Sequence, residues 1–241
     1  IIMEVNTGNV LAMANYPTYD LNDTRNTENL IGMPALDEKG KKISGEYLTE
    51  ESIKELNDEQ MYQQLNALWK NFCIVDSYEP GSVAKPFTVA AAIESGAITG
   101  NEYYTCEGKL EVGGYPIKCH QRFGDGTISV AEGIERSCNV VLMDVAFALG
   151  ENKFIDYQHL FGFGLKTNID LAGEARTASM VFSKDKIGRT ELATNSFGQG
   201  FNATMIQMIT GFCSMINGGY YYEPHVVSKI TTADGATISN I

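Results

Sequence analysis

A serine and a lysine three residues apart are the side chains of this sequence best suited to covalent chemistry. The segment 78–87 reads YEPGSVAKPF and places Ser82 three positions before Lys85. Residues at this spacing are neighbours on a helix surface, so the Lys85 amine could reach the Ser82 oxygen and take its proton. Pro80-Gly81 indicates a turn, Ser82 is a favoured helix-capping residue, and Pro86 is tolerated in a first turn. The pattern predicts a serine nucleophile at the start of a helix, although the same spacing also arises by chance.

Farther along the chain, Ser137-Cys138-Asn139 offers a hydroxyl and an amide within one short turn. The turn lies between two predicted helices, one beginning with the capping box Ser129 to Glu132 and one running from Val140 to Leu149. Such a pair can relay a proton and hold a carbonyl group of a substrate. The alternative for this pair alone is an ordinary capping element.

The elements around these residues predict an α+β layout. Alternating patterns indicate a hairpin of 1–5 with 10–14 and a second hairpin of 226–232 with 236–238, and helices lie between them. We expect the two ends of the chain to meet in one antiparallel sheet. A further helical stretch, 49–69, should break near Asn57-Asp58, and another helix should begin at Asn202 or Thr204.

The charge and composition of the chain argue against some classes of binding partner. The 241 residues include 30 acidic and 18 basic side chains, a formal charge of −12, which argues against nucleic acid or an anionic lipid surface. The length predicts one domain. No window is long and apolar enough to span a bilayer, and no signal-peptide pattern is present. Because the chain opens on a strand pattern without an initial Met, we expect an upstream part to be missing.

Two of the five cysteines stand in a polar, glycine-rich segment. Cys106 and Cys119 flank a Gly113-Gly114 turn, and His120 follows directly. Two thiolates and an imidazole are three ligands of a tetrahedral zinc site, and Asp125 or a residue outside the chain would supply the fourth. A disulfide and a pair of free thiols are the competing predictions. The other cysteines lie in apolar runs and are expected to be small buried residues: Cys73, Cys138 and Cys213.

Taken together and in this order, the motifs resemble the transpeptidase domain of penicillin-binding proteins, most closely the monofunctional class B type. The resemblance covers nearly the whole chain. Besides the Ser82 and Ser137 segments it includes four blocks: Asn6 to Met13, Phe161 to Gly164, Asp170 to Glu174, and Ser196 to Gly200 followed by Thr204 and Gln207. It implies a β-lactamase/transpeptidase-like fold, an antiparallel sheet flanked by helices with an all-helical subdomain that carries both motifs.

The resemblance also implies a peptidoglycan D,D-transpeptidase. Ser82 would attack the carbonyl of a D-Ala-D-Ala stem peptide, with Lys85 as its base; Ser137 would pass a proton to the leaving amine and Asn139 would hold the peptide. β-Lactams would acylate the same Ser82. No cofactor is implied as required, and the place of action would be the extracytoplasmic face of a bacterial membrane, beside other cell-wall synthesis proteins. The alternatives are a serine β-lactamase and a non-catalytic β-lactam sensor or scaffold.

The third motif of the family, Lys-Thr/Ser-Gly on a sheet strand, has no equivalent here. Lys166-Thr167-Asn168 is rejected because it lies inside the Phe161 to Glu174 block and has Asn where Gly is wanted. We therefore expect residues 1–241 to be a partial transpeptidase domain whose sheet is incomplete. The C-terminal strands with the third motif would come from the rest of the polypeptide or from a second chain. The resemblance also implies an N-terminal membrane anchor and a pedestal domain, and we expect both to lie outside residues 1–241.

Overall fold

An almost wholly apolar helix, α6 (Asn139–Leu149), forms the centre of the molecule in the computed structural model, which describes residues 1–240. Seven of its side chains are buried, and α4 (Lys85–Glu94) packs along it. Burial of this surface is the main force that fixes the two helices together. The helix ends where predicted, at Gly150, whose φ of 82° suits glycine.

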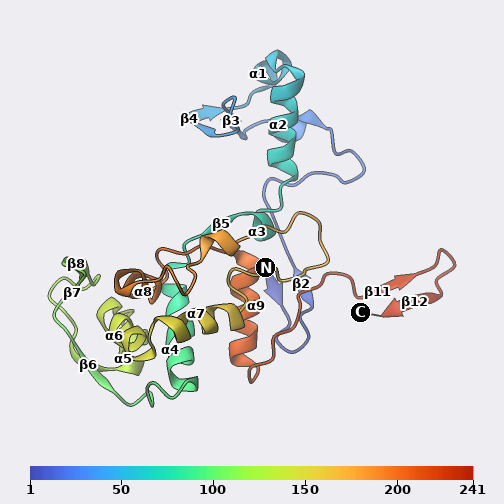
Figure 1. Ribbon diagram of the computed structural model, residues 1–241. Helices are drawn as coiled ribbons and strands as arrows, with labels where there is room; N and C mark the ends of the chain where they lie inside the picture. Colours follow the sequence, from blue (N-terminus) through green and yellow to red (C-terminus); the bar gives the residue numbers. More distant parts are fainter. Residues whose placement is uncertain (241) are drawn as a thin grey trace.

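Further helices lie around this pair (Figure 1). Their bounds are α3 (Phe72–Val75), α5 (Val130–Glu135), α7 (Glu151–Leu160), α8 (Arg189–Asn195) and α9 (Met205–Ile216), with 3₁₀ turns at Thr27–Leu30, Gly81–Ala84 and Ala178–Met180. The predicted capping box at Ser129 is present, and Thr204 caps α9 through the N–H of Gln207. On the other side of α4, the Phe87 ring meets the edges of three further rings at centroid distances of 4.9, 5.0 and 4.6 Å: Phe161, Phe163 and Phe212.

The segment 27–69 stands apart from this body (Figure 1). It contains β3 (Pro34–Leu36), β4 (Lys42–Tyr47), α1 (Glu50–Glu55) and α2 (Asp58–Trp69) around a small core of its own. The predicted break near Asn57 is confirmed, because Thr49 and Asn57 cap two separate helices through capping boxes. The main contacts of these elements are with one another and with the 3₁₀ turn Thr27–Leu30.

Within residues 1–240 every sheet has two antiparallel strands. The pairs are β1 (Ile2–Met3) with β2 (Val10–Ala12), β5 (Ser77–Tyr78) with β10 (Ala203–Thr204), β6 (Tyr103–Cys106) with β9 (Gly126–Ser129), β7 (Lys109–Val112) with β8 (Tyr115–Lys118), and β11 (Lys229–Thr231) with β12 (Thr237–Asn240), besides β3 with β4. Both predicted terminal hairpins are therefore confirmed, but the prediction that they join in one sheet is wrong for the described residues. Among residues 1–240, an isolated β-bridge joins Asn9 to His225 near the two ends of the chain.

No helix in the described part of the chain is long and apolar enough to cross a membrane.

Candidate active site

The turn that carries Ser82 is clamped against a distant loop. Gly81 has φ 59°, and its N–H donates to the carbonyl of Gly198 at 2.9 Å. A Cβ on Gly198 would lie 2.0 Å from the Gly81 carbonyl oxygen, so only glycine permits this approach. The Glu79 carboxylate accepts the N–H of Gly200 at 2.8 Å. Ser82 is thus held on a rigid turn and remains exposed to solvent.

Ser137 occupies an unusual backbone position. It follows the last turn of α5, where the N–H of Cys138 donates to the carbonyl of Gly133 (2.8 Å) and that of Ser137 to Ile134 (3.0 Å). This is a Schellman motif, in which the residue after the cap takes the left-handed conformation and is usually glycine. Here it is Ser137, with φ 55°. A non-glycine residue kept in this conformation indicates a position where the side chain matters.

Three of the predicted residues form one hydrogen-bonded chain. The Lys85 amine donates to the Ser137 carbonyl oxygen at 2.5 Å and to the Ser137 hydroxyl at 2.8 Å, and that hydroxyl donates to Ser82 Oγ at 3.0 Å. Lys85 and Ser82 are thus linked through Ser137. The expectation that Ser82 caps a helix is wrong, because the turn and α4 begin without a side-chain cap.

Burial lowers the pKa of the Lys85 amine, and the nearby Cys119 and Cys138 thiols act in the opposite direction. The side chain is only 2% exposed, and a buried ammonium is disfavoured relative to the neutral amine. A lowered pKa favours the neutral amine, which is the form that accepts a proton. The geometry and the direction of the pKa shift therefore both suit a base.

Asn139, the fourth predicted residue, begins α6 two positions after Ser137. Its side-chain amide donates to the Lys118 carbonyl at 3.2 Å, which ties the Ser137 turn to the end of β8. The structure thus brings the four residues into two neighbouring turns, with Asn139 outside the hydrogen-bonded chain.

A cluster of possible metal ligands lies directly beside the Ser137 turn. The ligand atoms of Cys106, Cys119, Asp125 and Cys138 all lie within 4.8 Å of one another. Cys119 Sγ is 3.8 Å from Cys138 Sγ and 3.9 Å from Asp125 Oδ2. Tetrahedral zinc with Zn–S bonds of about 2.3 Å separates its sulfur ligands by about 3.8 Å. The four atoms therefore fit one zinc ion.

This set differs from the one expected. Cys106 and Cys119 are in it, and Asp125 supplies the carboxylate, but Cys138 takes the place given to His120. His120 is not part of the cluster, although its Nδ1 lies 3.7 Å from Cys119 Sγ. Cys138 was missed because its apolar surroundings predict a small buried residue; its place inside the Ser137–Asn139 turn is the signal that points to it. Among the described residues all five cysteines are free, so the structure contains no disulfide there.

The thiols of Cys119 and Cys138 differ in how readily they ionise. Burial raises the pKa of the Cys119 thiol, but hydrogen bonds from the Gln121 and Asn139 backbone and from the other two thiols outweigh it, so the pKa is lowered. Burial raises the pKa of the Cys138 thiol. A thiol that ionises readily is a better metal ligand, because zinc binds the thiolate.

The segment Lys166-Thr167-Asn168 is a loop, with Asn168 at φ 61°. The Thr167 hydroxyl is buried and donates to the Glu174 carboxylate at 2.7 Å. This threonine is occupied in the loop's own hydrogen bonds, in agreement with its rejection as a third catalytic motif.

Comparison with known proteins identifies the family of this chain. Residues 1–240 match the family model of the penicillin-binding protein transpeptidase domain. The chain belongs to this family. Stage V sporulation protein D of Bacillus subtilis is 35% identical over 162 residues, which is 66% of this chain and 25% of that protein. The peptidoglycan D,D-transpeptidase FtsI of Escherichia coli is 28% identical over 230 residues, or 95% of this chain and 32% of FtsI. The chain thus spans a third or less of these relatives.

Solved structures agree on the fold. Penicillin-binding protein 3 of Mycobacterium tuberculosis, in a crystal structure with aztreonam, superimposes with a TM-score of 0.65 at 24% identity, over 71% of this chain and 38% of that one. A peptidoglycan synthetase of Bifidobacterium adolescentis gives a TM-score of 0.67 at 20% identity, over 77% of this chain and 32% of that one. The predicted α+β, transpeptidase-like fold is confirmed, with small and incomplete sheets in this chain.

Proposed function

We propose that this chain is the nucleophile-bearing part of a peptidoglycan D,D-transpeptidase that forms an acyl-enzyme on Ser82. The observation that carries the proposal is the hydrogen-bonded chain from the buried Lys85 amine through Ser137 to the exposed Ser82 hydroxyl. In a member of the penicillin-binding transpeptidase family, this arrangement provides a nucleophile, a relay and a base.

Each group has a defined part in the reaction. Hydroxyl hydrogens rotate, so when Lys85 is neutral the Ser82 proton can pass to Ser137 Oγ while the Ser137 proton passes to the Lys85 amine. Ser82 Oγ then bonds to the carbonyl carbon of the penultimate D-alanine. The peptide C–N bond breaks, and the proton returns through Ser137 to the amine of the departing D-alanine. Asn139 holds a carbonyl of the bound peptide.

The second half reverses these steps. An amine of another stem peptide attacks the ester carbon, the Ser82 Oγ–C bond breaks, and the proton of that amine restores the Ser82 hydroxyl. A β-lactam reacts with Ser82 in the same way, except that its leaving amine stays attached through the ring. The backbone donors that complete the oxyanion site would come with the Lys-Thr/Ser-Gly strand, from the rest of the polypeptide or from a second chain.

The setting follows from the relatives. Proteins named peptidoglycan D,D-transpeptidase and penicillin-binding protein support action on stem peptides outside the cytoplasmic membrane, beside other cell-wall synthesis proteins. The formal charge of −12 agrees with a partner other than nucleic acid.

The test is release of D-alanine from a synthetic pentapeptide by the full-length protein, with and without an amine acceptor. Wild type should release D-alanine and form the cross-linked amide, and Ser82→Ala should do neither. A penicillin adduct hydrolysed within seconds would indicate a β-lactamase instead. A stable adduct with no D-alanine release would indicate a sensor or scaffold.

We also propose that Cys106, Cys119, Asp125 and Cys138 bind one zinc ion with a structural role. The support is the tetrahedral spacing of the ligand atoms and the position of Cys138 between Ser137 and Asn139. Four protein ligands leave no open coordination position, which is typical of structural zinc. Bound zinc would fasten the Ser137 turn to the Cys119–Asp125 loop.

Metal analysis of the purified full-length protein, beside a thiol titration in denaturant, tests this site. We expect one zinc per protein, lost in Cys138→Ala and retained in Cys213→Ala, a matched control at a buried cysteine outside the cluster. Absence of metal with two titratable thiols fewer than the cysteine count would contradict the proposal in favour of a disulfide. Absence of metal with every thiol titratable would contradict it in favour of free thiols.

A further inference from the structure

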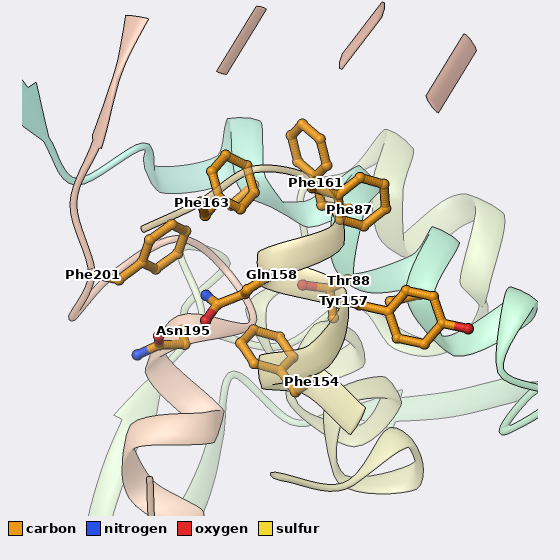
Figure 2. Close-up of a pocket in the computed structure, with 11 residues that line it drawn as sticks. Phe87, Thr88, Phe154, Tyr157, Gln158, Phe161, Phe163, Asn195 and Phe201 are labelled. Carbon is orange, nitrogen blue, oxygen red and sulfur yellow. The ribbon is translucent and has the colours of Figure 1, made fainter. Parts of the chain in front are cut away.

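A narrow cavity lies behind the turn that carries Ser82 (Figure 2). Its lining includes Ala84, two residues after Ser82 in the chain, together with Gln158 of α7 and Asn195 of α8. Most of the lining is aromatic. The space admits about one water molecule rather than an organic ligand.

Two carboxamide oxygens in this cavity are unusual. Gln158 Oε1 and Asn195 Oδ1 are buried and have no hydrogen-bond partner among residues 1–240. Their side chains are 6% and 0% exposed. The orientation of Asn195 is fixed, because its Nδ2 donates to the Gln199 carbonyl at 3.1 Å. Native proteins rarely leave buried acceptors unpaired, and a small buried polar cavity is where an ordered water pairs them.

Two acceptors that line one small cavity call for a molecule with two donors. A second acceptor would repel both, and an apolar group would satisfy neither. Water is the smallest molecule with two O–H donors, and it matches the room present. Neither hydroxyl side chain of the lining takes its place: the Thr88 hydroxyl already donates to the Ser196 carbonyl at 2.9 Å, and the Tyr157 hydroxyl points away from Gln158 and Asn195 (Figure 2).

Backbone hydrogen bonds also connect Asn195 to the turn that carries Ser82. Its backbone carbonyl accepts the N–H of Gly198 at 3.0 Å, and the Gly198 carbonyl accepts the N–H of Gly81 at 2.9 Å. Gly81 directly precedes Ser82. A shift of the Asn195 side chain would therefore reach Ser82 through two backbone hydrogen bonds, without passing through Lys85 or Ser137.

We propose that one internal water bridges Gln158 Oε1 and Asn195 Oδ1, and that these two amides are positioning residues for Ser82. The water joins α7 to the end of α8 and so sets how closely the Gly198 loop approaches Gly81. The kinetic consequence rests on the proposed function of Ser82, whereas the water site itself does not.

The first test is a crystal structure of the wild-type full-length protein at a resolution that shows ordered water. We expect a water within hydrogen-bond distance of both amide oxygens. A flipped Gln158 whose Nε2 donates directly to Asn195 Oδ1, with no water between them, would overturn the proposal. This result does not depend on whether the protein reacts with penicillin.

The second test separates positioning from stability. Gln158→Met keeps the side-chain length and removes the acceptor, and we expect its first-order acylation constant for a fluorescent penicillin to fall about tenfold while the Kd of the initial complex changes less than twofold. Gln64→Met is the matched control, because Gln64 is 2% exposed and its Oε1 is also unpaired within residues 1–240, but it lies in α2 of the separate 27–69 segment. It should acylate at the wild-type rate.

A Gln158→Met protein that acylates at the wild-type rate would refute the positioning role, even if its melting temperature falls. An equal slowing in Gln64→Met would refute it as well, because the effect would then follow from lost stability. A wild-type protein that does not react with penicillin would instead refute the proposed function, and the crystal structure would still decide the water site.

Discussion

Removal of the Ser137 hydroxyl is the perturbation that bears most directly on the proton relay. Among residues 1–240 this oxygen connects Lys85 to Ser82, at 2.8 Å from the amine and 3.0 Å from Ser82 Oγ. Ser137→Ala deletes both hydrogen bonds. The Lys85 amine keeps the Ser137 carbonyl at 2.5 Å, so the base should stay in place while losing its path to the nucleophile.

The size of the effect follows from that geometry. Positioned acid–base groups contribute about 10²- to 10⁴-fold to rate. Because Lys85 stays in place and a water can enter where the hydroxyl was, we expect the lower end, about a hundredfold. This corresponds to about 2.7 kcal/mol of transition-state stabilisation. The assay is the first-order acylation constant for a fluorescent penicillin, measured on the full-length protein.

Ser137→Gly is the matched control. It also lacks the hydroxyl, but glycine adopts φ 55° without strain, whereas alanine keeps the Cβ and with it the strain, on the order of 1 kcal/mol, that Ser137 already has. Equal slowing in the two variants would assign the loss to the hydroxyl. Slowing confined to Ser137→Gly would assign it to the backbone, and less than threefold slowing in both would refute the relay.

Three further predictions test the surrounding structure. Burial lowers the pKa of Lys85, and only the neutral amine accepts a proton, so the acylation rate should fall as the pH drops through that lowered pKa. Lys85→Arg stays protonated and should be inactive throughout a pH–rate profile. Activity in this variant would contradict the role of Lys85 as a base. Gly198→Ala should lower the melting temperature and slow acylation, because its Cβ would lie 2.0 Å from the Gly81 carbonyl oxygen. The control Gly96→Ala, at φ 70° with open space around it, should reduce the free energy of unfolding in denaturant by only on the order of 1 kcal/mol. Equal reductions in the two variants would argue against the contact between Gly81 and Gly198. Zinc removal by a chelator should lower the melting temperature and slow acylation in wild type but leave Cys138→Ala unchanged, and an equal response in both would count against the cluster as the zinc site.

The sequence indicated which candidate side chains lie close together, but not how they are connected. Ser82 and Lys85 were identifiable because they stand three residues apart at a predicted helix start. Ser137 was identifiable because it stands two residues before Asn139 in a predicted turn. The route of the proton through Ser137 was not, because it depends on how α5 and α6 pack and on the left-handed backbone of Ser137. Cys138 was missed for a similar reason: neighbours in sequence indicate burial, whereas ligand geometry comes from β6, the Cys119 loop and α6 meeting in space.

Local signals also decided how well the fold was predicted. The capping boxes at Thr49, Asn57 and Ser129 fixed where helices begin, because a cap is satisfied within four residues. The terminal hairpins were predictable because hairpin closure is local as well. Their union in one sheet was not, because pairing between distant strands depends on long-range contacts that alternation alone does not specify.

The most direct test of the account is mass spectrometry of the full-length protein after incubation with penicillin, with the modified peptide sequenced. The account predicts one adduct with the mass of the intact β-lactam, attached to Ser82 and absent from Ser82→Ala. An adduct on another residue, or an unmodified protein whose folding has been verified, would contradict the assignment of Ser82 as the nucleophile.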